Sequence, residues 1–181
     1  MPSHSLSLAL RRTGAMLLDM VVVYAWIIVL TLLSFTVNAV IPFHGAMGSS
    51  YIARHLVGFT TLTLPIVLYF VVMEGSSRQA TWGKRRLGLR VVAHEGDVTT
   101  RGQRLVRNAM KFLPWEMVHT HMHMNPGFVM TGETSMAGWL LGIYVPCGVA
   151  LVYIVQVLAA KNGRTLYETR SRTCTIRNPE S

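Results

Sequence analysis

One charged side chain, Asp19, lies inside an apolar run that is long enough to cross a lipid bilayer. An ionised carboxylate in hydrocarbon costs roughly 2.5–3.5 kcal/mol even on the lenient insertion scale. The fold must therefore pair Asp19, neutralise it or turn it toward a polar interior. Arg12 lies seven residues earlier, on the same face of a helix and roughly 10 Å away along its axis. Its long side chain can lean toward Asp19 while the guanidinium stays near the interface.

Hydrophobic residues make up 51% of the chain, yet its formal net charge is +9. This combination is typical of a polytopic membrane protein with basic loops, and it is unusual for a soluble domain. The length of 181 residues predicts a single domain, 1–181. Cys147 lies in an apolar run and Cys174 in the basic tail, so we expect no disulfide between them.

Three apolar segments, at about 15–40, 56–73 and 135–160, are each near the ~20 residues that a membrane helix needs. The first is too long for the apolar region of a signal peptide, which favours a retained helix. Pro65 is expected to kink the second segment. Proline and glycine are tolerated there because neighbouring helices satisfy the freed backbone groups.

A fourth segment, 110–125, is more polar and contains Glu116 and three histidines. The stretch 74–111 holds nine of the seventeen basic residues, and the tail 161–181 holds five more. Four crossings place the N-terminus, the basic loop 74–110 and the tail together on the cytoplasmic side, whereas three would separate them. We therefore predict that 112–124 enters the membrane as a polar span or a hairpin limb, with an interfacial helix as the alternative.

The predicted fold is an all-α polytopic membrane protein with about four membrane helices and both termini in the cytoplasm, in a bacterial cytoplasmic membrane. Within the basic loop, alternation after Gly88 predicts a short strand, and the sequence HEGD at 94–97 predicts a turn. The loop's basic residues indicate contact with anionic lipids, and the alternative is a vestibule for an anion or substrate. Those singled out are Lys84, Arg85, Arg90, Arg104 and Arg107. Basic juxtamembrane loops are common, so no nucleic-acid partner is expected.

Glu116, His119 and His123 share one helix face at positions i, i+3 and i+7. A carboxylate and two imidazoles suit zinc, iron or another first-row metal, and the methionines among them would favour copper. The alternative is a polar patch near the outer interface. His44 and His55, in the predicted outer loop, are candidates to complete a site. A transition metal is thus a candidate cofactor, and none is certain.

Four short motifs follow one another along the chain. They are Arg12-x-x-Ala15-x-x-x-Asp19, then TWGKRRLGLRVV at 81–92, then Arg104-x-x-Arg107-Asn108, and finally Leu166-Tyr167-Glu168 with Thr173 and Ile176 beyond. Together they resemble the signature of the RDD family of membrane proteins, which is named for one arginine and two aspartates. The resemblance covers about residues 8–176. It assigns the second aspartate to Glu168, which keeps the charge and lengthens the reach by one methylene.

The resemblance implies a membrane protein of uncertain function, with transport suspected and ion/proton exchange proposed for some members. Two interpretations of Arg12, Asp19 and Glu168 are open. They form an ion-pair cluster that holds the first helix against the loop and tail, with Arg170 and Arg172 as partners of Glu168. Alternatively, Asp19 carries a proton or cation, because pairing and burial shift the pKa of a carboxyl in opposite directions.

Two functions from different classes therefore remain, with metal binding through Glu116, His119 and His123 as a third. The first is a transporter of a small ion or solute, acting as an oligomer, with a wet path from Asp19 to Glu116. The second is a non-transporting regulatory or assembly subunit of a larger membrane complex, with a dry, ion-paired Asp19. Gly138 and Gly142 would give this subunit a small-residue packing face. No nucleophile elbow, phosphate loop or dinucleotide fingerprint is present, so an enzyme is not expected.

Overall fold

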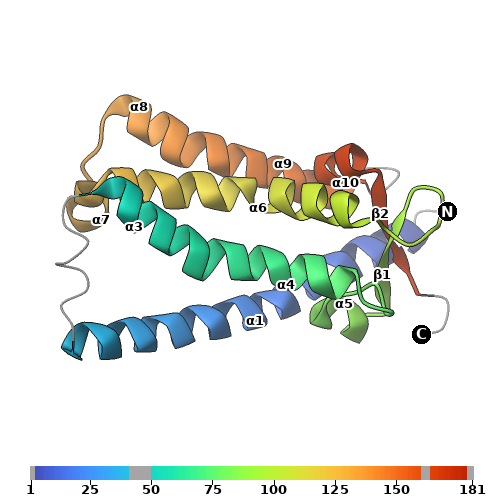
Figure 1. Cartoon of the computed structure of the whole chain (residues 1–181). Helices are drawn as coiled ribbons and strands as arrows, with labels where there is room; N and C mark the ends of the chain where they lie inside the picture. Colours follow the sequence, from blue (N-terminus) through green and yellow to red (C-terminus); the bar gives the residue numbers. More distant parts are fainter. Residues whose placement is uncertain (1–2, 41–49, 160–163, 179–181) are drawn as a thin grey trace.

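The computed structural model describes residues 3–40, 50–159 and 164–178, and four helical rods in these ranges lie side by side (Figure 1). The first rod is the single helix α1 (Ser3–Val40). The second consists of α3 (Tyr51–Gly58), the π-helical turn η1 (Phe59–Thr63) and α4 (Leu64–Glu74). The third is α6 (Arg101–Met124), and the fourth joins α8 (Met136–Trp139), the π-helical turn η2 (Leu140–Tyr144) and α9 (Val145–Ala159). The short helix α7 (Pro126–Thr131) lies between α6 and α8 in the chain.

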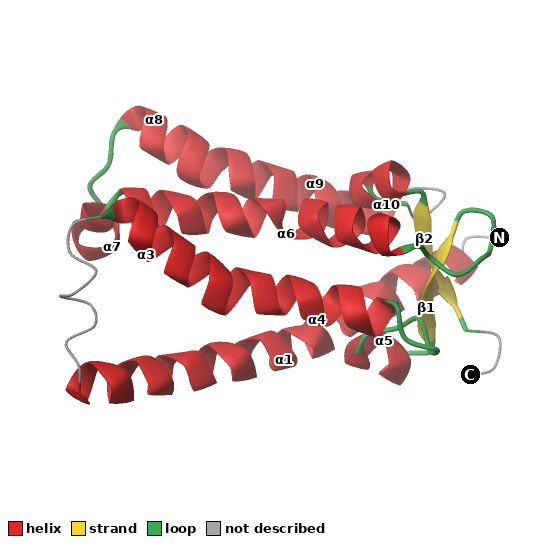
Figure 2. Cartoon of the chain, viewed as in Figure 1, coloured by secondary structure: helices red, strands yellow, loops and turns green. Residues whose placement is uncertain are grey.

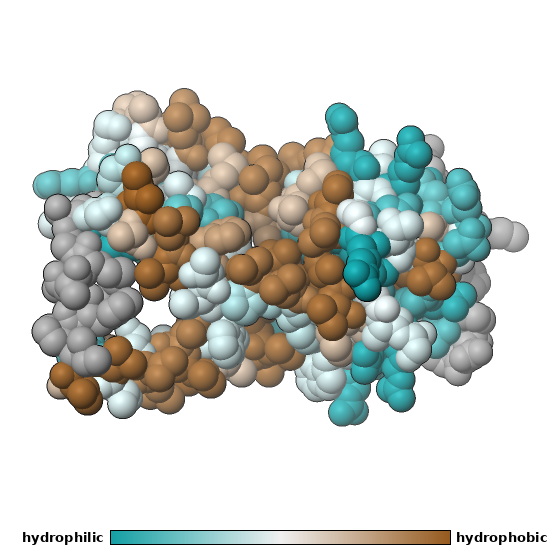
Figure 3. All heavy atoms as spheres, in the orientation of Figure 1, coloured by the Kyte–Doolittle hydropathy of each residue, from teal (hydrophilic) through white to brown (hydrophobic). Residues whose placement is uncertain are grey.

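Three of the rods are long and apolar enough to cross a membrane, over Leu8–Val40, Tyr51–Glu74 and Met136–Leu158. They confirm the three apolar segments expected from the sequence. The polar helix α6 lies alongside them and packs against α3, α4 and α9. Its polar side chains can therefore face other helices instead of lipid. Figure 3 shows the apolar surface over the middle of the bundle and hydrophilic side chains gathered at one end.

Prolines inside the rods free backbone carbonyls, and two of these carbonyls bind neighbouring helices. A proline cannot donate to the carbonyl four residues earlier, and its ring pushes that carbonyl aside. Pro65 frees the oxygen of Thr61, which accepts a 3.0 Å hydrogen bond from Trp26 Nε1 on α1. Pro114 likewise frees the oxygen of Met110, which accepts a 3.1 Å bond from the Tyr153 hydroxyl on α9. Pro114 therefore lies inside α6, and the freed carbonyl joins α6 to the fourth rod.

Both chain termini lie at the hydrophilic end of the bundle, here called the charged end (Figure 1). It also contains α5 (Trp82–Arg86), β1 (Leu89–Ala93), α10 (Leu166–Ser171) and β2 (Thr173–Arg177). The two strands pair antiparallel, with Val91 opposite Thr175 (Figure 2). The sequence predicted β1, but not α10 or β2, whose pairing joins parts of the chain that are far apart.

A small apolar cluster separates the charged end from the opposite, far end of the bundle. Val23 of α1 and Ile66 and Phe70 of α4 are buried together, and Phe112 of α6 packs against them. The rings of Phe70 and Phe112 meet edge to face, with centroids 5.0 Å apart. We call Val23, Ile66 and Phe70 the apolar layer.

The close packing of α5 on α1 predicts a sharp difference between two glycines. A methyl group at Gly83 would lie 2.2 Å from the Ala15 backbone oxygen, whereas one at Gly102 would meet nothing nearer than 4.0 Å. We expect Gly83→Ala to lower the free energy of unfolding by about 1–3 kcal/mol, because backbone must shift to admit the methyl group. Gly102→Ala, the matched control, should leave it unchanged or raise it slightly. Thermal unfolding in detergent measures both, and equal melting temperatures would contradict the packing of α5 on α1.

Candidate functional site

Arg107 connects two buried carboxylates at the charged end. Its Nη1 donates to Glu168 Oε1 at 3.2 Å, and its Nε lies 3.5 Å from Glu74 Oε2. The guanidinium also donates to the hydroxyls of Thr173 and Thr175 at 2.9 Å each. Only 2% of Arg107 is exposed, so one cation compensates two carboxylates away from water.

Glu168 is held by the local geometry at the start of α10. Thr165 and Glu168 form a capping box, in which Glu168 accepts a 3.0 Å bond from the Thr165 backbone N–H. Glu168 Oε2 also accepts a 2.6 Å bond from Arg12 Nη2, and Oε1 accepts a 2.8 Å bond from the Thr175 hydroxyl. Burial acts to raise the pKa of Glu168, but Arg107 and Arg12 outweigh it and lower this pKa to about 2.

Glu74 is fully buried at the end of α4 and has partners on two other elements. Lys84 of α5 donates to its Oε1, and the Asn108 side chain of α6 donates to its Oε2 at 2.9 Å. Burial lowers the pKa of Lys84, while the neighbouring Glu74 carboxylate acts in the opposite direction. Glu74 therefore joins the second rod to both α5 and α6.

Asp19 binds the N-terminus of α5. Its Oδ2 accepts a 2.6 Å hydrogen bond from the Thr81 hydroxyl, and its Oδ1 accepts a 2.8 Å bond from the Gly83 backbone N–H. A carboxylate is stabilised there because the first N–H groups of a helix lack partners within the helix. Asp19 is 1% exposed, so its charge is compensated without contact with bulk water.

The structure brings Arg12, Asp19 and Glu168 to the same end of the bundle, with other partners than we expected. Arg12, which we expected to lean toward Asp19, donates a short hydrogen bond to Glu168 on the tail. Arg170 and Arg172, the expected partners of Glu168, are exposed at the surface. We call the connected side chains the charged network: Arg12, Asp19, Glu74, Thr81, Lys84, Arg107, Asn108 and Glu168.

The basic residues singled out in the loop divide into a buried group and a half-buried group. Lys84 and Arg107 are 8% and 2% exposed, so the expected contact with anionic lipids does not apply to them. Their charges are instead used inside the charged network. Arg85 donates to the Ala80 carbonyl at 3.0 Å, Arg90 is half-buried on β1, and Arg104 donates to the Thr99 carbonyl.

A second polar group lies on the far side of the apolar layer, around Glu116 of α6. The Thr63 hydroxyl donates to Glu116 Oε2 at 2.6 Å, and His55 Nε2 lies 3.6 Å from Oε1. His119 Nδ1 is 3.7 Å from Oε2, and His119 Nε2 lies 3.1 Å from His123 Nε2. Glu116, His119 and His123 thus lie together as expected, and His55 joins them, while His44 lies outside the described residues.

These groups form a chain and do not converge on one point. His119 directs one ring nitrogen toward Glu116 and the other toward His123, so its two neighbours lie on opposite sides of the imidazole. Within the described ranges, no three His, Cys, Asp or Glu side chains are arranged to hold a metal ion. The arrangement instead suits the passage of a proton between a carboxylate and two imidazoles.

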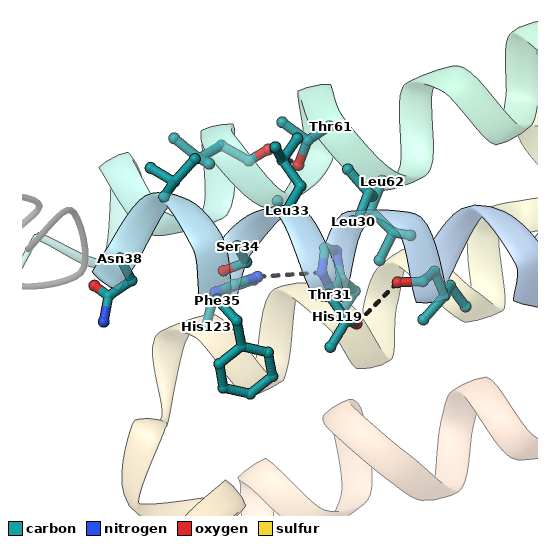
Figure 4. Close-up of a pocket in the computed structure, with 14 residues that line it drawn as sticks. Leu30, Thr31, Leu33, Ser34, Phe35, Asn38, Thr61, Leu62, His119 and His123 are labelled. Atoms are coloured by element: carbon teal, nitrogen blue, oxygen red, sulfur yellow. Dashed lines mark hydrogen bonds between the residues drawn. The ribbon is translucent and has the colours of Figure 1, made fainter. Parts of the chain in front are cut away.

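A cavity of about 500 Å³ opens beside the imidazoles (Figure 4). It lies between the far half of α1, the α3–η1 segment and α6. Figure 4 shows His119 and His123 joined by their short contact at this cavity. Ile27 and Leu62 line it and also pack against the apolar layer, so the cavity ends on that layer.

Gly138 and Gly142 pack against His121 of the same chain. They therefore do not form the outward packing face that we expected. A methyl group at Gly142 would lie 2.2 Å from His121 Cγ, and one at Gly138 would lie 2.9 Å from His121 Cε1. These glycines admit the buried His121 of α6 between the third and fourth rods. A second cavity of about 500 Å³, lined by Glu116 and His121 among others, adjoins them.

Sequence reasoning missed three members of the charged network, Glu74, Thr81 and Asn108. The sequence did contain a signal for Glu74, because it is the first charged residue after the apolar segment 56–73. Asp19 was singled out on a similar ground, as the one charged residue in an apolar run. Thr81 and Asn108 stood inside two of the quoted motifs without an assigned role.

A family model described as the RDD family matches residues 6–167. The match contains Arg12, Asp19, Glu74, Lys84 and Arg107, and it ends one residue before Glu168. No curated protein and no solved structure matches the chain.

The position of Arg107 predicts a large loss of stability when its charge is removed. Arg107→Met breaks two buried ion pairs, and although Lys84 and Arg12 still contact the carboxylates, the loss of a buried partner typically costs about 3–5 kcal/mol. Arg170→Met, at the exposed face of the same end, should change the free energy of unfolding by no more than about 0.5 kcal/mol. Thermal unfolding of both variants in the same detergent makes the comparison. Equal losses would show that Arg107 does not bridge the carboxylates.

The lowered pKa of Glu168 predicts a pH dependence. An unfolded glutamate titrates near 4.5 and folded Glu168 near 2, so the unfolded chain binds more protons between these values. The stability from ionised Glu168 is therefore complete above about pH 5 and is lost as the pH falls toward 2. Glu168→Gln should flatten the fall of melting temperature in this window, whereas the exposed control Glu95→Gln should not. An unchanged slope in Glu168→Gln would contradict the assigned pKa.

Proposed function

The chain belongs to the RDD family of membrane proteins, and from that premise we propose that it is a proton-coupled carrier of a small solute or ion. The observation that carries the proposal is a succession of three layers along the bundle. A cavity lies in the far half of the bundle, beside the chain formed by Glu116, His119 and His123. The apolar layer follows, and the charged network closes the other end.

The distribution of charge gives the proposed orientation. Basic side chains are concentrated at the charged end, which the positive-inside rule places in the cytoplasm. The cavity then opens outward, and the charged network is a closed cytoplasmic gate. This arrangement is one of the two states that a carrier must alternate between, with access from one side at a time.

Glu116 is the carboxylate that we assign to proton coupling. Its partner Thr63 lies halfway along the apolar span Tyr51–Glu74, so Glu116 lies at a similar depth. Ionisable groups at that depth are rare and usually mark a pathway for ions or protons. The imidazoles of His119 and His123 connect Glu116 to the cavity, and this connection supplies a route for protons.

Asp19 fits the gate better than the carrier role that the sequence suggested. Both of its oxygens accept hydrogen bonds, and the apolar layer lies between it and Glu116. We propose that Asp19 holds α5 against α1 while the gate is closed. Exchange of protons for cations at Asp19 would require the gate to open first.

The alternative is a non-transporting regulatory or assembly subunit. The charged network alone would suit it, because ion pairs can fix helix packing without any movement. It leaves the far cavity and the half-buried chain of titratable groups without a role. The glycine face proposed for a partner is occupied by His121 of the same chain.

Alternating access predicts opposite changes in accessibility on the two sides of the apolar layer. In a background of Cys147→Ala and Cys174→Ser, Thr61→Cys would report on the cavity and Ile66→Cys on the apolar layer. We expect a membrane-impermeant maleimide to label Thr61→Cys from outside in sealed vesicles. Adding Glu168→Gln, which removes two ion pairs from the gate, should slow that labelling and permit labelling of Ile66→Cys from the cytoplasmic side.

Leu151→Cys, on the exposed face of α9, is the control and should keep its labelling rate in both backgrounds. Correctly folded protein that shows no reciprocal change would support the assembly-subunit alternative. Glu116→Gln should leave the cavity accessible but abolish proton movement coupled to any solute found to be transported.

A further inference from the structure

We propose that the far cavity binds a single-chain amphiphile with an acidic head group, such as a free fatty acid. This inference rests on the proposed carrier function, because it names the substrate class for the same cavity. The size, the apolar walls and the placement of the basic groups each support it.

The cavity has the size and wall chemistry of a site for one alkyl chain. Its volume of about 500 Å³ lies within the usual range for small-molecule sites. Its lining runs along α1 from Ile27 to Asn38, roughly 16 Å of helix. Most of the walls are apolar side chains, contributed by Leu30, Leu33, Val37, Val57 and Leu62.

Two threonines in the lining present little hydrogen-bonding capacity to a ligand. The hydroxyl of Thr31 donates to the Ile27 carbonyl at 2.8 Å, and that of Thr61 donates to the Val57 carbonyl at 2.7 Å. Both donors are thereby used within their own helices. Apart from the two imidazoles and Ser34 and Asn38 of α1, the walls offer a small polar solute few contacts, whereas each buried methylene of an alkyl chain contributes about 0.8 kcal/mol.

Basic groups lie at the part of the cavity that would hold an acidic head group. His119 and His123 line the cavity with their Nε2 atoms 3.1 Å apart, and Arg54 of α3 is near enough to His123 to interact with it electrostatically. No acidic side chain belongs to the described lining. Glu116 lies on the other side of His119, at Nδ1. A carboxylate head that faces both Nε2 atoms would accept a hydrogen bond from each of them, in place of the contact between the two rings.

Gly58 makes the position of the imidazoles possible. A methyl group there would lie 2.7 Å from His123 Nε2 and 2.9 Å from His119 Cε1. The helix surface is thus cut away where the two rings meet the cavity. Any larger side chain at 58 would displace the rings that would hold the head group.

The cavity runs from its basic groups at the far end to its apolar end in the middle of the bundle, as a lipid in one leaflet runs from head group to chain. His123 and Arg54 lie toward the far end of the bundle, whereas Ile27 and Leu62 lie against the apolar layer in the middle. An acidic head at the imidazoles would therefore place its chain toward the centre of the membrane. A free fatty acid in the same leaflet has this orientation before it binds.

The test uses full-length protein in lipid nanodiscs and a laurate analogue with a photoreactive diazirine on its chain. Adduct sites are located by mass spectrometry, and three competitors with the same chain are compared: laurate, dodecanol and dodecyltrimethylammonium. We expect adducts on the cavity residues Leu30, Leu33 and Leu62. Laurate should compete at about tenfold lower concentration than the neutral or cationic competitor.

Variants separate recognition of the head group from burial of the chain. His119→Gln combined with His123→Gln should abolish the about tenfold preference for laurate while leaving competition by dodecanol unchanged. Gly58→Ala, which keeps both imidazoles but displaces them, should reduce the preference in the same way. Thr120→Ala, on the same helix but lining the second cavity, is the control and should keep it.

Equal competition by laurate and dodecanol would overturn the inference. So would adducts spread equally over Leu151, Val155 and Leu158, on the exposed face of α9, since these report general contact with lipid. Reciprocal cysteine labelling without a preference for laurate would keep the carrier and overturn this substrate class. A preference for laurate without reciprocal labelling would establish a binding site and overturn the carrier, and with it the acid's role as substrate.

Discussion

The fold of the charged end depends on one arginine that compensates two buried carboxylates. Arg107 lies between Glu74 of the second rod and Glu168 of the tail, and each carboxylate also binds another cation. Removing water from such groups costs several kcal/mol per ion, which only a complete set of partners offsets. The tail therefore cannot leave the bundle without exposing unpaired charge. The capping box at the start of α10 positions the Glu168 side chain for these contacts.

Elements that depend on local composition could be predicted from the sequence, whereas elements that depend on contacts between distant residues could not. The apolar segments follow from composition alone, because a span needs only length and hydropathy. The β1 strand follows from local alternation. The strand β2 and helix α10 do not, since their stability comes from pairing with β1 and from Arg107, far away in the sequence. The sequence singled out Arg12, Asp19 and Glu168, but helical spacing suggested pairing within α1, whereas tertiary packing selected Glu168 for Arg12.

The polar helix α6 belongs in the bundle because its neighbours are shaped to receive it. Gly58 makes space for His119 and His123, and Gly142 makes space for His121. The π-helical turns η1 and η2 lie directly before Pro65 and Pro146, on the two rods that contact α6. Such turns often occur at functional sites. A helix that hydropathy would reject is thus accommodated by glycines and irregular backbone in rods that are themselves apolar.

The carboxylates at the two ends of the bundle differ in how fully they are hydrogen-bonded. This difference favours exchange of a proton or ligand at Glu116 over exchange at the charged end. At the charged end both oxygens of Asp19, Glu74 and Glu168 accept hydrogen bonds. At Glu116, Oε1 is buried without a hydrogen bond, as is the Nδ1 atom of the neighbouring His119. A buried acceptor without a hydrogen bond is stabilised when it binds a proton or a ligand. A fully bonded acceptor would have to give up hydrogen bonds in the same exchange. The fully bonded carboxylates of the charged end and the incompletely bonded Glu116 beside the far cavity are therefore chemically distinct sites, separated by the three apolar side chains Val23, Ile66 and Phe70.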